Sequence, residues 1–283
     1  MKTKKNKIGL ILPAFIFLIG LSIAIYPLIS RVYYSREAKN QVAAFEQVKK
    51  QLVDEEVEKR MDLAQAYNNT LDPTKLGDPF TDKERQGVAE YARMLEAHEK
   101  LGHVEIPKIA QDLPIYAGTS EVVLQKGVGH LEGTSLPIGG ISTHSVITAH
   151  RGLPNAKLFT DLDDLELGDT FYIHNIKEVL AYRVDQILVV EPSDFEPVLV
   201  ENGKDYATLL TCTPYMVNSH RLLVRGQRID YVPAVQELEI AVNHQSKMYQ
   251  VLFYITFVIL IIVLVRLIYN QIKKRKKYNK EII

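Results

Sequence analysis

Hydrophobic residues form one long run near each end of the chain. Residues 8–30 carry no charged side chain and are mostly apolar, and four lysines precede them. A second apolar run begins at Met248 and is followed by Arg266 and a lysine-rich tail. Because about 20 apolar residues let a helix cross a bilayer, we expect transmembrane helices over residues 8–30 and 248–269.

The basic residues that flank these runs predict the topology. Lysine and arginine are retained on the cytoplasmic side of a membrane, so residues 1–7 and 270–283 are expected to be cytoplasmic tails. Everything between the two spans then lies outside the cell, with residues 233–247 as a juxtamembrane linker. A cleaved signal peptide is the alternative for the first run; the length of that run and the lack of a small-x-small cleavage site favour an uncleaved anchor.

Between the spans, the periodicity changes from helical to β-like. Residues 31–70 are expected to form an amphipathic helical arm, since Ser35 to Asn69 contains no Gly or Pro and has apolar residues at helical spacing (Val42, Phe45, Val48, Leu52). This pattern predicts one long helix. Residues 71–82 form a loop rich in Asp, Gly and Pro, and Thr81 with Glu84 resembles a capping box that opens a second helix ending near His98.

After Gly102 the chain consists of short β-rich runs separated by Gly and Pro. The runs that we expect to be strands are Val104–Pro107, Leu113–Tyr116, Ser145–Ala149, Thr170–Ile173, Leu180–Val190, Tyr206–Leu210 and Arg221–Gly226. Many short strands at modest spacing are typical of a closed or nearly closed β-barrel. We therefore predict a mainly β domain over residues 83–232, with its leading helix.

The formal charge of zero conceals an uneven distribution. The sequence has 34 basic and 34 acidic residues; four lysines precede residue 8, and seven basic residues and one Glu lie from Arg266 onward. Residues 31–247 therefore hold 23 basic and 33 acidic residues, a net charge of −10. Such a domain lacks the basic footprint that nucleic-acid binding needs.

The candidate chemistry centres on the single cysteine. Cys212 cannot form an internal disulfide, and it follows a predicted strand, with Arg221 opening the next strand and His150 ending an earlier one. A cysteine becomes a good nucleophile where cationic neighbours favour the thiolate. Arginine has five donors with which to hold a substrate carbonyl or an oxyanion. We therefore predict a site made of Cys212, His150 and Arg221.

Other interpretations remain open at this point. A lone cysteine in an apolar strand is also commonly a small buried residue. The remaining histidines are interpreted as surface or structural residues, although His220 competes with His150 through its proximity to Arg221; they are His98, His103, His130, His144, His174, His220 and His244. Asn218 raises a papain-like Cys-His-Asn arrangement, but the chain order of Cys and His is reversed. Arg225 and Arg228 are expected to face solvent.

Several segments resemble one known family. The block around the cysteine, Thr208–Tyr215 with Asn218 and His220–Gly226, is similar to the active-site block of sortases, specifically the class C type that assembles pili. Two further segments are similar to the same family: Thr148–Pro154 with Lys157–Leu162, and Gly127–Pro137. The resemblance covers most of the outer domain. It implies a sortase-type closed β-barrel of about eight strands with N-terminal helices and two transmembrane helices.

The resemblance also implies an activity. A membrane-bound cysteine transpeptidase of a Gram-positive bacterium would cleave an LPXTG-like sorting signal between Thr and Gly, with Cys212 as nucleophile, His150 as acid or base, and Arg221 steadying the oxyanion. The acyl group would pass to a lysine amine of a pilin, without cofactor or metal. An anchoring sortase that uses the cell-wall precursor is one alternative. A membrane-tethered adhesin or scaffold, with Cys212 only in the core, is the other.

The family likeness gives the loop over residues 71–82 a further role. Class C sortases carry a lid with an Asp-Pro-aromatic triplet, and Asp78-Pro79-Phe80 matches it. By this likeness Asp78 would pair with Arg221, and Phe80 would lie against Cys212. The alternative, from the residues alone, is a turn that leads into the Thr81 cap.

Overall fold

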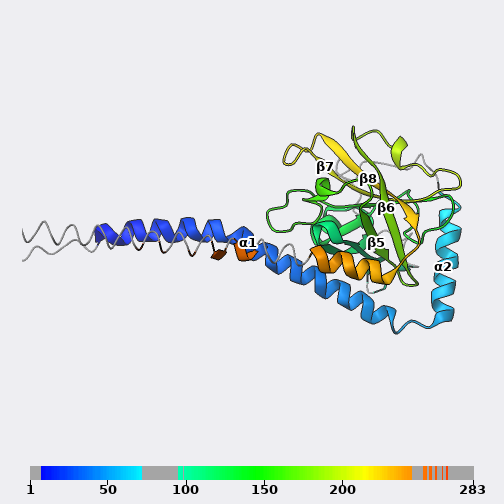
Figure 1. Cartoon of the computed structure of the whole chain (residues 1–283), viewed down its shortest axis with the longest axis horizontal. Helices are drawn as coiled ribbons and strands as arrows, with labels where there is room; N and C mark the ends of the chain where they lie inside the picture. The colour runs from blue at the N-terminus through cyan, green and yellow to red at the C-terminus, as the bar shows by residue number, and fades with distance from the viewer. Residues whose placement is uncertain are drawn as a thin grey trace, which may run out of the picture. The chain divides into compact units, whose positions relative to one another are not determined.

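The computed structural model describes residues 8–71, 95–97 and 99–243, together with scattered residues between 251 and 266. The chain divides into two compact units, Met1–Val232 and Pro233–Ile283. The first contains two N-terminal helices and the β-domain (Figure 1). In the second, residues 233–243 of the predicted juxtamembrane linker are helical. The predicted lid triplet Asp78, Pro79 and Phe80 lies outside the described residues.

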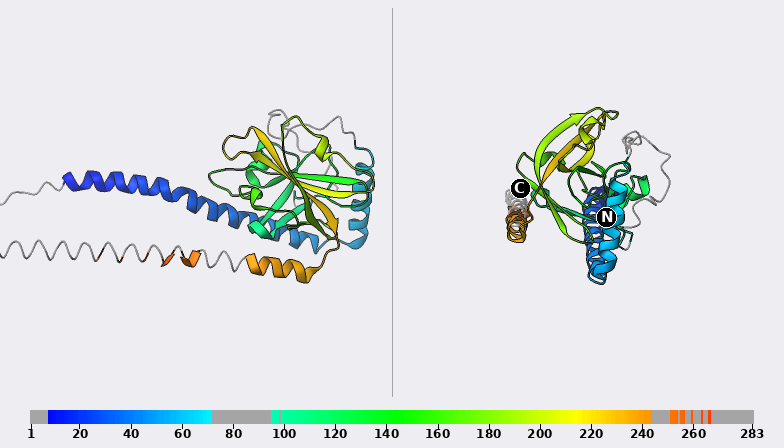
Figure 2. Two further views of the ribbon diagram at one scale, coloured as in Figure 1. Left: turned by 45° about the horizontal axis from the view of Figure 1, so that its top comes forward. Right: turned by 90° about the vertical axis from the view of Figure 1, so that its right-hand side faces the viewer.

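Eight strands close into a barrel, which confirms the predicted mainly β fold with a sortase-type closed barrel. They follow one another around the barrel in the order β1-β2-β3-β4-β7-β8-β6-β5. Figure 2 gives two further views of the domain. Their bounds are β1 Gly102–Ile106, β2 Gln111–Ala117, β3 Val128–His130, β4 Thr143–Thr148, β5 Thr170–His174, β6 Val179–Val190, β7 Asp205–Thr213 and β8 His220–Ile229. Most pairs are antiparallel, but β2 with β3 and β4 with β7 are parallel.

Alternation along the strands separates two apolar clusters. On β7, Ala207 and Leu209 belong to the main core, whereas Leu210 belongs to a second cluster. Because successive side chains of a strand point to opposite faces, the second cluster lies on the other face of the sheet. Its buried members are Leu131, Val146, Val198, Leu210 and Leu223. The short helix η5, Glu196–Val198, contributes one of them.

The main core requires a glycine on β8. Phe171 and Tyr182 stack there with ring centroids 5.5 Å apart. A Cβ on Gly226 would lie 2.6 Å from the Phe171 ring. Since such a contact is too close for any real side chain, the aromatic pair and the glycine depend on each other.

The prediction of one helix over Ser35–Asn69 is wrong, because the structure has two. Helix α1 spans Ile8–Lys49 and α2 spans Asp54–Asn68. Val53 between them is extended, and α2 opens with three acidic residues, Asp54, Glu55 and Glu56. Negative charge stabilises a helix N-terminus through the macrodipole, so this acidic triplet favours a new start where neither Gly nor Pro marks a break.

Both helices pack on the barrel through apolar side chains. Phe45 of α1 and Ala64 of α2 are fully buried in the main core. Polar contacts reinforce α2, since Asn68 accepts a hydrogen bond of 2.8 Å from the backbone N–H of Leu136. On α1, the carboxylate of Glu46 lies 3.3 Å from His103 Nε2 of β1. Burial would lower the pKa of His103, but hydrogen bonds to Asp112 and Glu46 outweigh it and raise the pKa to about 9.

The predicted membrane spans are only partly described. Residues 8–30 lie within α1, and the described residues between 251 and 266 are helical. In the part of the chain that the structure describes, no helix reaches both the length and the apolar character needed to traverse a bilayer. The two-span arrangement therefore stays a prediction.

Candidate active site

Cys212 and Arg221 face each other on neighbouring strands. Cys212 is the penultimate residue of β7, Arg221 is the second residue of β8, and the two are direct partners in the antiparallel register. Directly opposed residues place their side chains on the same face, with Cβ atoms about 5 Å apart. The thiol and the guanidinium are therefore neighbours, as the sequence predicts.

His150 reaches the same place from the other side of β7. Strand β4 runs parallel to β7, and the last pair in their register is Thr148 with Leu210. His150 and Cys212 each lie two residues beyond that pair. Both are therefore at the carboxyl ends of their strands, at the same end of the barrel. The connection is held there by two hydrogen bonds: Ala149 N donates to Leu210 O at 3.2 Å, and Thr211 Oγ1 donates to Ala149 O at 2.7 Å.

The turn after His150 depends on a glycine and an aromatic ring. Gly152 has a φ of +88°, and a Cβ at this position would lie 3.0 Å from the Tyr215 ring. The positive φ favours glycine over any residue with a Cβ. Phe159 N donates to His150 O at 3.3 Å and closes the loop. These contacts fix the backbone that carries the imidazole.

Burial differs among the three side chains. Cys212 and Arg221 are both 5% exposed, whereas His150 is half-buried and its Nε2 lies 3.3 Å from Glu121 Oε2. Arg221 Nη1 donates to the backbone carbonyls of Asn218 and His220 at 3.1 and 3.0 Å. These two bonds orient the guanidinium without adding a negative charge beside it.

A second arginine, which was not among the predicted site residues, stabilises this end of the barrel. Arg151 Nη1 donates to Thr213 Oγ1 at 3.0 Å, and its Nη2 lies 2.5 Å from Asp163 Oδ2. Arg151 therefore ties the segment after β4 to the end of β7, one residue from Cys212. Its position next to His150 was the available signal, but its partners are known only from the fold.

The second apolar cluster lies beside the thiol. Leu210 precedes Cys212 by two residues and Leu223 follows Arg221 by two, so both lie on the same face as the reactive pair. Thr148 has the same relation to His150, and its buried Oγ1 has no hydrogen-bond partner among the described residues. The thiol and the guanidinium thus lie at the end of a buried apolar cluster, which holds the two strands that carry them.

Comparisons with known proteins identify the family. Residues 104–229 match the model of the sortase domain. The crystal structure of sortase C-1 from Streptococcus pneumoniae is 62% identical and has a TM-score of 0.67, and the match covers 68% of this chain and 100% of that chain. The chain belongs to the sortases, in class C. It is therefore a cysteine transpeptidase.

Two further relatives agree with this assignment. The pilus-related sortase C of Group B Streptococcus is 61% identical, with a TM-score of 0.65 and coverage of 67% of this chain and 97% of that one. Sortase A of Bacillus anthracis is 26% identical over 182 residues, which are 64% of this chain and 81% of the relative. The likeness is strongest to sortases C of streptococci among these three.

The strand geometry discriminates between the two candidate histidines of this sortase. His220 is adjacent to Arg221 on β8, so its side chain points to the opposite face from Arg221 and Cys212. There its Nε2 lies 3.2 Å from Glu191 Oε1. His150 lies two residues after the end of β4, at the same end of the barrel as Cys212.

Other predictions for the basic residues need correction. Arg225 was expected to face solvent, but it stacks over the Tyr206 ring at 4.0 Å and forms ion pairs with Asp185 and Glu201 at 2.9 and 3.1 Å. Arg228 likewise lies 3.4 Å from Glu178. The two arginines lie three residues apart on β8 and therefore point to opposite faces. On each face, acidic side chains from other segments pair with the arginine.

Proposed function

We propose that Cys212 attacks the Thr–Gly amide of an LPXTG-like sorting signal and forms a thioester acyl-enzyme. The observation that carries this proposal is the register of β4, β7 and β8. This register brings His150, Cys212 and Arg221 to the same end of the barrel. Cys212 is the only cysteine in the sequence, so a cysteine transpeptidase has no other thiol to use.

The neighbours of the thiol have complementary roles in this proposal. His150 accepts the proton of the Cys212 thiol or protonates the leaving amine, and Glu121 at 3.3 Å orients its ring. Arg221 donates to the substrate carbonyl and to the oxyanion of the tetrahedral intermediate. The alternative, in which Cys212 is only a core residue, does not explain why a buried guanidinium lies directly opposite the thiol.

The second half-reaction transfers the acyl group to a lysine amine of another pilin, giving an isopeptide bond. Support for a pilin acceptor comes from the likeness to the pilus-related sortase C of Group B Streptococcus. Transfer to the cell-wall precursor is the competing outcome. The two differ in product: the first gives a ladder of covalent pilin polymers, and the second gives pilin joined to peptidoglycan fragments.

The experiment combines the purified full chain with a candidate pilin and maps the cross-linked peptides by mass spectrometry. We expect a Thr–Lys isopeptide bond between two pilin molecules and a trapped thioester on Cys212. The Cys212→Ala variant should give neither product while it retains the fold, since one small side chain replaces another. Polymer formed by that variant would disprove the covalent mechanism.

We also propose that Asp78-Pro79-Phe80 act as a lid over this site, with Asp78 toward Arg221 and Phe80 toward Cys212. The support is the family's triplet together with the apolar residues that lie next to Cys212 and Arg221 on the same face, Leu210 and Leu223. Replacing both Asp78 and Phe80 by Ala should raise the labelling rate of Cys212 by a thiol reagent by roughly 5- to 150-fold, the range of typical coupling energies. An unchanged rate would mean that the loop is a connector.

Membrane attachment completes the proposal, with both termini in the cytoplasm and the barrel outside. Large apolar side chains of α1 are exposed in the span predicted over residues 8–30, among them Ile16, Ile19, Ile23 and Ile29. A lipid environment would cover them. Protease added to intact protoplasts should digest the barrel and spare the two basic tails, and digestion of the tails instead would contradict this topology.

A further inference from the structure

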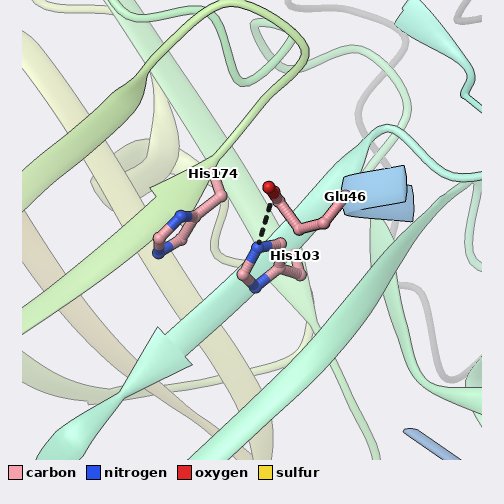
Figure 3. A group of neighbouring side chains, drawn as sticks. All are labelled: Glu46, His103 and His174. Carbon is pink, nitrogen blue, oxygen red and sulfur yellow. Dashed lines mark hydrogen bonds and ion pairs between the residues drawn. The ribbon is translucent and has the colours of Figure 1, made fainter. Parts of the chain in front are cut away.

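Two histidines and a glutamate converge where α1 meets the barrel, on elements that the transpeptidase site does not use. Glu46 comes from α1, His103 from β1 and His174 from β5 (Figure 3). One potential ligand atom from each residue lies within 4.8 Å of the other two. We propose that these three side chains form a site for a divalent transition metal ion, with Zn²⁺ as the best fit.

The spacing of the donor atoms supports this assignment. His103 Nε2 lies 3.3 Å from Glu46 Oε1. Tetrahedral zinc with bonds of about 2.0–2.1 Å separates its ligand atoms by about 3.3–3.4 Å. The first pair therefore already has the separation that an ion needs. His174 is stacked beside His103 with ring centroids 4.1 Å apart, so its ring has to turn out of the stack for its nitrogen to point at the same ion.

Further carboxylates occupy the positions around the cluster that a metal site requires. Asp112 Oδ1 lies 2.6 Å from His103 Nδ1, the ring nitrogen that points away from Glu46. Histidines that ligate zinc usually donate their second N–H to a carboxylate, which fixes the ring and strengthens the ligand. Glu105 Oε2, 3.5 Å from His174 Nε2, places another carboxylate beside the second imidazole.

The backbone makes this arrangement stiff. His103 and His174 are direct partners in the β1–β5 register, so the two imidazoles share one face of the sheet. Phe45, the residue before Glu46, is fully buried in the main core and anchors that turn of α1. Lys49 Nζ lies 4.0 Å from Glu46 Oε1, an ion-pair distance, so this lysine has to turn toward solvent when the ion binds.

Bound zinc would join α1 to two strands of the barrel, because its ligands come from all three elements. The ion therefore has a structural role in this proposal: it fixes the helix that leads from the N-terminus onto the catalytic domain. Ligand atoms from elements distant in sequence are brought together only by folding, so metal binding and docking of α1 should stabilise each other.

The test is a calorimetric titration of ZnCl₂ into the metal-stripped full chain. All proteins carry Cys212→Ala, because the catalytic thiol is itself a zinc ligand and would confuse the result. We expect one zinc ion per chain. In this background His174→Gln should weaken zinc binding by at least 100-fold, and Asp112→Asn by roughly 10- to 100-fold, the range found for partners of ligating histidines.

A matched control uses a histidine–carboxylate pair that lies outside the cluster and outside the active site. His220 lies 3.2 Å from Glu191 but belongs to no three-residue cluster among the described residues, so His220→Gln should bind zinc with unchanged affinity. Glu46→Gln, on the helix surface, provides a second ligand variant if His174→Gln fails to fold. Unchanged affinity in either ligand variant, or no stoichiometric binding in the parent, would refute the site.

Hydrogen exchange tests the structural consequence. Zinc should slow amide exchange along α1 around Glu46 in the parent and have no such effect in His174→Gln. Replacing zinc by Co²⁺ should give the intense visible absorption of a tetrahedral site. Exchange that is indifferent to zinc in the parent, or a cobalt spectrum retained in His174→Gln, would count against the proposal.

Discussion

At the scale of single residues, two arginines on one strand have different surroundings. Arg221 and Arg225 lie four residues apart on β8 and therefore point to the same face. Two backbone carbonyls orient Arg221 beside the thiol, whereas Asp185 and Glu201 pair with Arg225. In the proposed mechanism the first arginine holds the substrate, whereas the ion pairs of the second stabilise the wall of the barrel.

Lysine substitutions should separate these two roles. Lysine keeps the positive charge but loses the planar fork of five donors. We expect Arg221→Lys to lower kcat by about 10²–10³-fold, as for the loss of an oxyanion donor. Arg225→Lys should leave kcat nearly unchanged and lower thermal stability slightly. For both variants, kcat is measured with an LPXTG peptide and stability with a thermal melt. Equal losses of kcat in the two variants would show that Arg221 has no special role.

Valine substitutions at two buried threonines should change the stability of the barrel in opposite directions. Thr148 Oγ1 is buried without a partner among the described residues, while Thr208 Oγ1 lies 2.7 Å from His144 Nε2. Removing an unsatisfied hydroxyl relieves a desolvation cost, whereas removing the hydroxyl of Thr208 leaves Nε2 of His144 without this hydrogen bond. Thr148→Val should therefore raise the free energy of unfolding by about 1 kcal/mol, and Thr208→Val should lower it by about 1–3 kcal/mol.

Urea denaturation measures both threonine variants against the parent chain. The two residues lie on adjacent strands, β4 and β7, and both are almost fully buried. General effects of a valine in this wall are therefore shared between them. If both variants lose stability equally, the hydroxyl of Thr148 has a partner that the fold supplies in solution.

At the scale of elements, sequence patterns predicted most strands and the reactive residues but not their arrangement. The β-rich runs bounded by Gly and Pro predicted β1, β2 and β4 to β8. The three-residue strand β3, Val128–His130, was missed because it is too short for any periodicity. The order of strands around the barrel depends on long-range pairing, such as β4 beside β7, which no local pattern contains.

The same limit applies to the sites. Cys212 and Arg221 are nine positions apart and share a recognisable block, so the sequence predicted their meeting. Glu46, His103 and His174 are widely separated, and each looks like an ordinary surface residue by itself. Glu121 likewise reaches His150 only through the fold. Motifs identify residues that are close in sequence, and clusters assembled by folding need the structure.

The docking of α1 can be tested by removing its central anchor. Phe45 is fully buried, and truncation of a buried Phe typically costs about 3–5 kcal/mol. Phe45→Ala should lower the free energy of unfolding of the chain by this amount. Leu63→Ala is the control, since Leu63 of α2 is 50% exposed and should change stability by less than about 0.5 kcal/mol. Similar small effects at both positions would mean that α1 packs weakly.

At the scale of the whole molecule, buried neutral histidines connect the stability of the barrel to pH. Burial lowers the pKa of His130 and of His144 to about 4 in each case. His130 Nε2 donates to Ser135 O at 2.8 Å, and His144 Nδ1 donates to Leu199 O at 2.9 Å. Both rings are therefore held in their neutral form, His130 on β3 and His144 on β4, the strand that pairs with β7.

The sign of the pH dependence follows from these values. An unfolded histidine titrates near pH 6.5. Between pH 6.5 and about 4 each of these histidines is therefore protonated in the unfolded state and neutral in the folded state. Stability is complete above pH 6.5, falls as pH decreases, and levels off below about 4. At pH 5 the loss should be about 2 kcal/mol for each histidine.

His144→Gln isolates one of these contributions. Glutamine can replace the hydrogen bonds of His144 but does not titrate, and the charged groups that act on His144, namely Arg225, Glu201 and Asp185, are common to both chains. The difference in unfolding free energy between pH 7 and pH 5, measured in urea, should therefore be smaller by about 2 kcal/mol in the variant. Any overall destabilisation by the substitution cancels in this comparison, because it is present at both pH values. An identical pH dependence in the two chains would mean that His144 is protonated in the folded barrel, and that its contact with the Leu199 carbonyl does not require the neutral ring.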